Sequence, residues 1–134
     1  MISANCFLDS NVILYLFDEE GRKREKAESL VSSVPYINSQ VLVEVGNICK
    51  RKFGYSKSDI TNIWSDLLMD CICVDIGDAT MKYAIELIKR YDFQLFDSII
   101  VASALEMKCV TLFSEDMQDG MVIDEVLTIV NPFI

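Results

Sequence analysis

The amino-acid sequence predicts an α/β fold, a three-layer α/β/α sandwich with a mostly parallel central sheet. Short apolar segments that favour strands alternate with longer segments in which apolar residues recur every three or four positions, as in amphipathic helices. Apolar strands of this kind are covered by helices on both faces, which is the environment of parallel sheets. The 134 residues fit one domain, residues 1–134, because single domains commonly contain ~100 to 150 residues.

The first half of the chain begins with a predicted strand at Cys6–Leu8. Asp9-Ser10-Asn11 then favours a turn and a helix cap, so a helix is expected from Val12 onwards. The charged stretch from Asp18 to Glu28 continues into a second helix that stops before Pro35. The other predicted elements of this half are a strand at Tyr36–Asn38, a helix from Ser39 to near Gly54, and a helix that starts near Ser56.

The second half continues the alternation of strands and helices. A short strand is expected within Cys71–Ile76, and Gly77-Asp78 opens the next helix. A further helix is expected from Asp97, because apolar residues follow it at helical spacing. The last predicted elements are a strand at Val110–Phe113, a loop at Ser114–Asp116 and a strand at Val126–Val130. Right-handed crossovers would bring the residues that follow the parallel strands to one edge of the sheet.

The composition excludes several classes of protein and of active site. Hydrophobic residues make up 51% of the chain and Gly and Pro are few, which excludes a collagen-like, low-complexity or disordered chain. The absence of histidine excludes Ser-His-Asp triads, Cys-His dyads and histidine-containing zinc sites. With 12 basic and 21 acidic residues the formal net charge is −9, so the average surface repels nucleic acids and anionic membranes. The abundant reactive groups are carboxylates.

The cysteines and the N-terminal stretch bear on location. The five cysteines show no CxxC spacing and lie in apolar segments, so they are expected to be reduced, buried thiols. Only eight residues precede the first acidic residue, Asp9, so the start of the chain is expected to be neither a signal peptide nor a transmembrane segment. No other uncharged apolar run approaches ~18 residues. We expect a soluble, cytoplasmic protein that does not bind membranes.

The predicted strands and helices place four acidic residues in one region of the fold. Asp9 and Asp116 each follow a predicted strand, so both are expected at the same edge of the sheet. Asp97 lies at the beginning of a helix and can reach this edge from the first turn. Glu44 lies on the inward-facing apolar stripe of its helix, where a carboxylate is costly without a partner or a cation.

Each acid also has a simpler structural interpretation, except Glu44. Asp9 and Asp97 fit helix caps and Asp116 fits a solvated loop, whereas capping does not explain an acid on the apolar stripe of a helix. If the four carboxylates lay within ~4 to 6 Å, they would repel one another unless one is protonated or a divalent cation lies among them. Oxygen ligands without His or Cys favour a hard ion, Mg²⁺ or Mn²⁺.

Four segments of the chain together resemble a known family. They are Cys-Phe-Leu-Asp9-Ser-Asn-Val, the helix that carries Glu44, Phe-Asp97-Ser-Ile-Ile-Val-Ala-Ser-Ala, and Thr-Leu-Phe-Ser-Glu-Asp116-Met-Gln-Asp-Gly. In order and spacing they resemble the PIN-domain nucleases, specifically the VapC-type toxins of toxin–antitoxin pairs, over nearly the whole chain. The resemblance implies an α/β/α fold, a Mg²⁺- or Mn²⁺-dependent endoribonuclease that acts on RNA, a homodimer and a small antitoxin partner.

The same resemblance implies roles for individual residues. The residues that match the acidic site, as catalytic groups and metal ligands, are Asp9, Glu44, Asp97 and Asp116, with Asn11 and Ser114 as supporting polar residues. Asp119 stands where many relatives carry a different polar residue, so it either assists the metal or caps the Asp-Gly turn. The expected reaction is phosphodiester hydrolysis, in which Asp9 and Asp97 contact the main ion and Glu44 or Asp116 orients the attacking water.

The basic and aromatic residues have two interpretations each. The basic clusters Arg22-Lys23-Arg24 with Lys26, and Lys50-Arg51-Lys52, either line an RNA groove or belong to solvated helix faces. Aromatic residues such as Tyr15 and Phe53 either stack on bases or, as is more common, belong to the core.

Two alternative functions stay open at this point. A response-regulator receiver is similar in length and in its acidic pocket, but it requires a pair of acids after the first strand and a lysine after a late one. Here Asp9-Ser10-Asn11 supplies one acid, and Lys108 precedes its strand. The other alternative is a PIN-like binding scaffold without catalytic turnover, which has the same sequence pattern and is separated from a nuclease by a cleavage assay.

Overall fold

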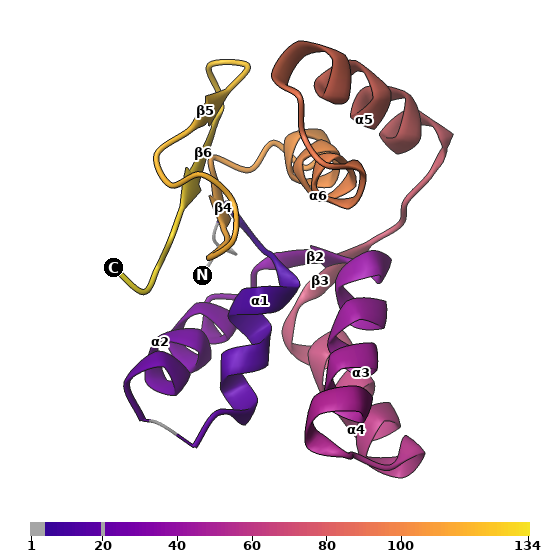
Figure 1. Cartoon of the computed structure of the whole chain (residues 1–134), viewed down its shortest axis with the longest axis vertical. Coiled ribbons are helices and arrows are strands. Elements are labelled where there is room, and N and C mark those ends of the chain that lie inside the picture. Colours follow the sequence, from indigo (N-terminus) through magenta and orange to yellow (C-terminus); the bar gives the residue numbers. More distant parts are fainter. Residues whose placement is uncertain (1–4, 20) are drawn as a thin grey trace.

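The fold is built around one sheet (Figure 1). The computed structural model describes residues 5–19 and 21–134; residues 1–4 and Glu20, which belong to the N-terminal stretch and the charged segment discussed above, lie outside the described residues. The strands are β1 (Cys6–Leu8), β2 (Tyr36–Asn38), β3 (Ile72–Val74), β4 (Thr111–Phe113), β5 (Val122–Ile123) and β6 (Leu127–Val130). They form a 6-stranded sheet in the order β3-β2-β1-β4-β6-β5, in which only the β5–β6 pair is antiparallel. This confirms the predicted mostly parallel sheet.

Helices cover both faces of the sheet. They are α1 (Ser10–Ile13), the 3₁₀ helix η1 (Leu14–Phe17), α2 (Gly21–Ser32), α3 (Ser39–Phe53), α4 (Lys57–Asp70), α5 (Asp78–Tyr91) and α6 (Leu95–Glu106). Figure 1 shows α1 to α4 on one side of the sheet and α5 and α6 on the other, which confirms the three-layer sandwich. Over the described residues, none of these helices combines the length and the apolar character needed to cross a lipid bilayer.

Signals in the sequence set the ends of α3 and α4. Asn38 caps α3, because its side chain accepts the Val41 N–H at 3.1 Å. Gly54 ends α3 with a φ of 66°, a left-handed conformation that glycine adopts without strain. Ser56 and Asp59 then form a reciprocal capping box at the start of α4. The chain therefore reverses sharply between these two helices.

The core lies on both sides of the sheet and between the helices. Phe7, Leu112 and Ile129, from three neighbouring strands, are fully buried. An added Cβ on Gly46 would lie 2.8 Å from the indole Cζ2 of Trp64, so α3 and α4 approach this closely only because position 46 is glycine. All five cysteines are free thiols. Four of them are buried as expected, whereas Cys73 is only partly buried.

Three local features differ from the expectation. Helix α6 begins at Leu95 with Gln94 as its N-cap, so Asp97 lies inside the first turn and is not the cap. The helix after Asp9 is short, because α1 gives way to the 3₁₀ helix η1 at Leu14. The antiparallel strand β5 was not predicted, since it has only two residues and therefore no readable alternation. Its turn to β6 places Asp124 and Glu125 at φ angles of 51° and 59°, without the glycine or asparagine that usually marks such a turn.

Candidate active site

The ends of β1 and β4 bring two acids to the same edge of the sheet. The two strands are adjacent and parallel, with Leu8 opposite Phe113. Asp9 and Asp116 therefore leave the sheet at the same edge, and the Asp9 N–H donates to the Phe113 carbonyl at 3.0 Å. Asp9 also caps α1, because its Oδ1 accepts the Ser10 N–H at 2.8 Å. A single side chain thus serves as a cap and as part of the acidic group.

The Asp9 carboxylate is buried, with only 5% of the residue exposed. Its Oδ2 accepts hydrogen bonds from Ser114 Oγ at 2.9 Å and from Asn11 Nδ2 at 3.2 Å. Burial, together with the charges of Glu44 and Asp97, raises the pKa of Asp9 to about 6 in spite of the hydrogen bonds that it accepts. Ionised Asp9 is therefore costly in the free protein, and a cation beside it would remove that cost.

Glu44 on α3 and Asp97 in the first turn of α6 extend the acidic group. Both residues are partly buried, and burial is the main cause that raises the pKa of each. The charge of Asp97 also raises the pKa of Glu44, and the charge of Asp116 raises the pKa of Asp97. Together with the effects on Asp9, these interactions link all four carboxylates electrostatically. We call these four residues the acid cluster.

Asn11 connects the two ends of the acid cluster. Its Nδ2 lies 3.2 Å from Asp9 Oδ2, 3.2 Å from Ser114 Oγ and 3.3 Å from Asp116 Oδ2. Its Oδ1 accepts the Glu115 N–H at 2.9 Å, which fixes the side of the amide that faces the acids. Both residues expected to support the site, Asn11 and Ser114, therefore contact the Asp9 carboxylate.

A contact that the sequence did not predict holds the loop after β4 against η1 and α2. Glu115 accepts hydrogen bonds from Tyr15 Oη at 2.7 Å and from Lys23 Nζ at 3.1 Å, and Lys23 also donates to Tyr15 Oη at 3.1 Å. The Lys23 ammonium lies 4.7 Å from the centre of the Tyr15 ring. The only signal in the sequence was that Glu115 stands between two expected site residues, which does not reveal its partners.

Asp119 is engaged outside the acid cluster. Its Oδ1 accepts the Asn131 N–H at 2.7 Å, which ties the loop to the segment after β6. The next residue, Gly120, has a φ of 86° and continues the turn. Asp119 is not among the causes that raise the pKa values of Asp9, Glu44 or Asp97. Its hydrogen bond to Asn131 gives Asp119 a structural role in this loop, and its role at the metal stays a prediction.

The donors of the acid cluster fit a hard divalent cation. They are carboxylate oxygens, which Mg²⁺ and Mn²⁺ prefer. Among residues 5–19 and 21–134, no group of three or more acidic or cysteine side chains is gathered tightly enough to enclose a metal ion. Mg²⁺ is usually held by one or two carboxylates and several waters, so a complete protein cage is not required.

Comparisons with known proteins agree with the fold. The model of the PIN domain family matches residues 6–118. Among solved structures, a toxin–antitoxin complex from Klebsiella pneumoniae contains a chain of similar fold with 21% sequence identity and a TM-score of 0.71. The similarity covers 95% of the present chain and 97% of the other. A search of curated proteins found no match.

Two further solved structures share this architecture. VapC20 of Mycobacterium tuberculosis, described as a toxin that cleaves the sarcin–ricin loop, has 18% identity and a TM-score of 0.67, over 83% of the present chain and 91% of its own. VapBC2 of Rickettsia felis, bound to a DNA fragment from its promoter, has 17% identity and a TM-score of 0.64, over 92% and 96% respectively. At these identities the similarity concerns the fold.

Proposed function

This chain belongs to the PIN domain family, and from that premise we propose that it is a Mg²⁺- or Mn²⁺-dependent endoribonuclease that hydrolyses RNA phosphodiester bonds. The observation that carries the proposal is the acid cluster, in which carboxylates from four separate segments interact and the pKa values of Asp9, Glu44 and Asp97 are raised. Gathering like charges at a sheet edge lowers the stability of the fold. The chemistry of a cation and a phosphate accounts for such an arrangement.

The residues of the acid cluster would divide the work of the reaction. A divalent ion, when bound, would polarise the scissile phosphate and lower the pKa of the attacking water. Asp9 and Asp97 would hold the main ion, while Glu44 and Asp116 complete its surroundings directly or through water. Of the latter two, we assign the orientation of the attacking water to Glu44, which is partly buried on α3 and whose pKa is raised by burial. Asn11 and Ser114 position Asp9 through its Oδ2.

An RNA cleavage assay with matched variants tests this function. Wild-type protein should cleave RNA oligonucleotides with Mg²⁺ or Mn²⁺ and not with a chelator. Asp97→Asn should lower the rate on the order of 10³-fold, because a metal ligand acts only as part of the assembled site. The matched control is Asp66→Asn, which changes an exposed acid on α4 and should cleave at the wild-type rate. A folded wild-type protein without metal-dependent cleavage would leave the binding-scaffold alternative in place of the nuclease.

We further propose that this nuclease is the toxin of a toxin–antitoxin pair that acts on cytoplasmic RNA and is neutralised by a small antitoxin. Support comes from relatives in fold, which include a toxin–antitoxin complex and a toxin described as cleaving the sarcin–ricin loop. Expression in a bacterial host should arrest growth, and co-expression of the small protein encoded beside it should restore growth. Normal growth with the lone protein would contradict the toxin role while leaving the cleavage assay to judge the nuclease.

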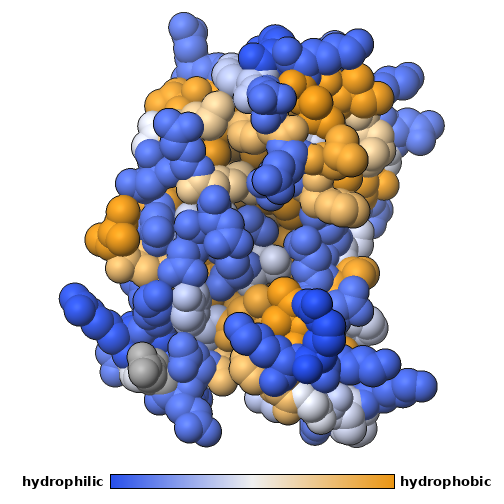
Figure 2. Space-filling model, viewed as in Figure 1, coloured by the Kyte–Doolittle hydropathy of each residue, from blue (hydrophilic) through white to orange (hydrophobic). Residues whose placement is uncertain are grey.

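We propose a homodimer as the state in solution. Leu95 and Phe96, at the start of α6 and beside Asp97, are 70% and 66% exposed. Figure 2 shows hydrophobic surface gathered over the part of the molecule where α5 and α6 lie. Apolar surface of this kind is typical of protein-interaction sites, and a second copy of the chain would cover it. Light scattering of the purified protein measures the state directly.

A further inference from the structure

A cavity of about 730 Å³ opens between η1 and α3, beside the acid cluster. Figure 2 shows hydrophobic surface in this region, bordered by hydrophilic side chains. The lining residues that matter here are Asn11, Phe17, Lys52, Phe53, Tyr55 and Glu115. They come from distant parts of the chain, so the cavity is a product of the fold.

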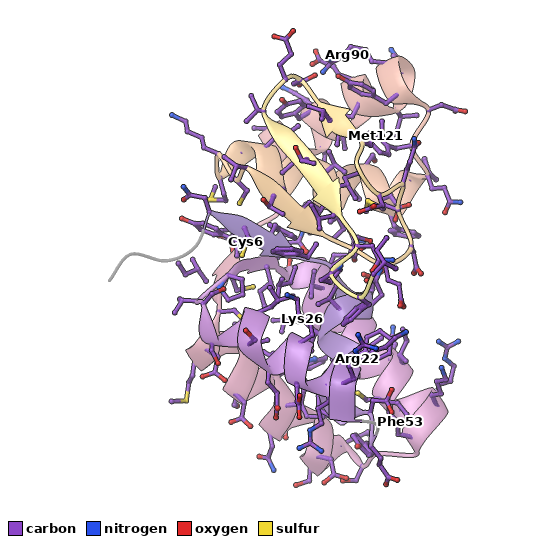
Figure 3. All side chains as sticks on the ribbon, turned by 90° about the vertical axis from the view of Figure 1, so that its left-hand side faces the viewer. Cys6, Arg22, Lys26, Phe53, Arg90 and Met121 are labelled. Carbon is purple, nitrogen blue, oxygen red and sulfur yellow. The ribbon has the colours of Figure 1, made fainter. Side chains whose placement is uncertain are left out.

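Aromatic rings form one wall of the cavity. Tyr55 meets the ring of Phe17 edge-on at 6.1 Å between centroids, and its centroid lies 5.6 Å from that of Phe53 at an interplanar angle of 38°. Phe53 is 41% exposed, although burial would favour a phenylalanine side chain. Figure 3 shows Phe53 at the outer end of α3. An exposed aromatic ring can serve as a platform on which a nucleobase stacks.

Basic residues stand at the same end of α3. Lys52 lines the cavity, and Lys50 and Arg51 precede it in the last turn of the helix. All three are exposed. This cluster places positive charge beside the aromatic wall in a chain with a net charge of −9. The lining also contains the acids Asp18, Glu19 and Glu115, of which Glu115 is paired with Lys23. The combination of stacking rings with cations that contact phosphates is the usual design of a single-strand nucleic-acid site.

Asn11 connects the cavity to the acid cluster. It lines the cavity, and its Nδ2 contacts both Asp9 Oδ2 and Asp116 Oδ2. A base in the cavity and a phosphate at the acid cluster would thus lie on opposite sides of the Asn11 side chain. A base and the neighbouring phosphate of one RNA strand are arranged in this way. We infer that this cavity binds a nucleobase of single-stranded RNA next to the scissile phosphate, with stacking on Phe53 and Tyr55 and a phosphate contact at Lys52. The inference rests on the proposed nuclease function.

Binding of labelled RNA oligonucleotides in the presence of a chelator tests the cavity without cleavage. Phe53→Ala should weaken binding at least about fivefold, because one base–aromatic stack is lost. Phe53→Trp should bind as the wild type does, whereas Phe53→Leu, which keeps apolar bulk without a ring, should resemble Phe53→Ala. Removing the base at one position of the oligonucleotide should weaken wild-type binding by a similar factor and should cost Phe53→Ala nothing further.

Matched controls separate the cavity from general effects. Leu68→Ala truncates another exposed apolar side chain, on α4, and should bind RNA as the wild type does. Lys52→Ala should reduce the slope of log affinity against log salt by about 0.7, the value expected for one lost phosphate contact on a single strand. Lys82→Ala, an exposed lysine on α5, should leave the slope unchanged.

Two outcomes would overturn the inference. If Phe53→Ala binds RNA as the wild type does, the cavity receives something other than a base, such as an apolar segment of a protein. If Phe53→Leu restores full binding, bulk rather than stacking is recognised. Because these titrations need no cleavage, they judge the cavity even if the variants of the acid cluster disprove the nuclease.

Discussion

The carboxylates of Asp9 and Asp124 both accept several hydrogen bonds, yet the fold moves their pKa values in opposite directions. Burial raises the pKa of Asp9 to about 6, while hydrogen bonds, first of all from Arg90, lower the pKa of Asp124 to about 2. Asp9 lies beside other carboxylates, whereas Asp124 is partly exposed beside a guanidinium. Because both carboxylates accept hydrogen bonds, these bonds do not explain the difference. The sign of the neighbouring charge and the depth of burial decide the direction of the pKa shift.

Asp124 fastens the β5–β6 hairpin to α5. The two terminal nitrogens of Arg90 lie 2.6 Å from Oδ1 and 3.1 Å from Oδ2, which is a bidentate pair. Tyr83 and Tyr91 donate their hydroxyls at 2.8 Å and 2.9 Å, and the Tyr91 oxygen accepts the Asp124 N–H at 3.0 Å. Figure 3 shows Arg90 and Phe53 at opposite ends of the molecule, so this contact is remote from the cavity.

The comparison separates a stabilising carboxylate from one that we propose to be functional. Ionised Asp124 is favoured by its partners, so its charge holds two elements together. Ionised Asp9 is disfavoured by its surroundings and becomes favourable only when an opposite charge is supplied from outside the chain. The fold therefore accepts lower stability at one edge of the sheet, where we propose catalysis, and gains stability at the hairpin.

The largest expected difference between the two carboxylates is their response to metal. Mn²⁺ at about 100 times its Kd should stabilise the wild type by about 2.7 kcal/mol, a rise in Tm on the order of 10 °C. Asp124→Asn should show the same rise from a lower starting Tm, and Asp9→Asn should show little or none. Calorimetry with and without Mn²⁺ measures these shifts. An equal rise in Asp9→Asn would remove Asp9 from the metal site.

A second prediction concerns the stability that Asp124 supplies. Asp124→Asn should lower the free energy of unfolding by about 1 to 2 kcal/mol at pH 7, allowing for the partial exposure of Arg90. The folded pKa of about 2 lies below the ordinary value of 3.8, so the loss should be constant above pH 5 and should shrink as the pH falls from about 4 toward 2. Urea unfolding at several pH values measures this. Asparagine tolerates the left-handed φ at this position, so the variant reports the charge.

The smallest expected effect has the opposite sign. In metal-free protein the raised pKa of Asp9 lowers stability once both folded and unfolded states are ionised, above about pH 6, and has no effect below about pH 4. The shift from 3.8 to about 6 corresponds to roughly 3 kcal/mol at most. Asp9→Asn should regain only about 1 kcal/mol of this free energy of unfolding at pH 8. The gain is partial because the new amide faces the amide of Asn11. The gain should vanish near pH 4, and a gain that grows on acidification would contradict this account of Asp9.

Much of the acid cluster could be predicted because it depends on local signals and on one rule of topology. The strands before Asp9 and Asp116 are apolar and short, and parallel strands place the residues after them at one edge. Glu44 could be singled out because an acid on an apolar stripe has no role as a cap. For Asp9 the two interpretations proved compatible, since its carboxylate both caps α1 and interacts with the other acids.

The parts that could not be predicted depend on contacts between distant residues. Lys23 and Glu115 are 92 positions apart, and nothing in either neighbourhood of the sequence indicates their pairing. The Asp124 contact depends on β5, whose two residues carry no pattern, and on a turn without glycine. The cavity beside Asn11 likewise arises only when the fold brings residues of η1 and α3 to its lining.

Gly54, the left-handed residue at the end of α3, separates Phe53 from Tyr55 and so sets the angle between two of the rings that line the cavity. A turn of this kind can be replaced without changing the sheet. It lies outside the sheet that carries Asp9. In the nuclease that we propose, a different turn grafted between α3 and α4 would therefore change the RNA preference and leave the acid cluster intact.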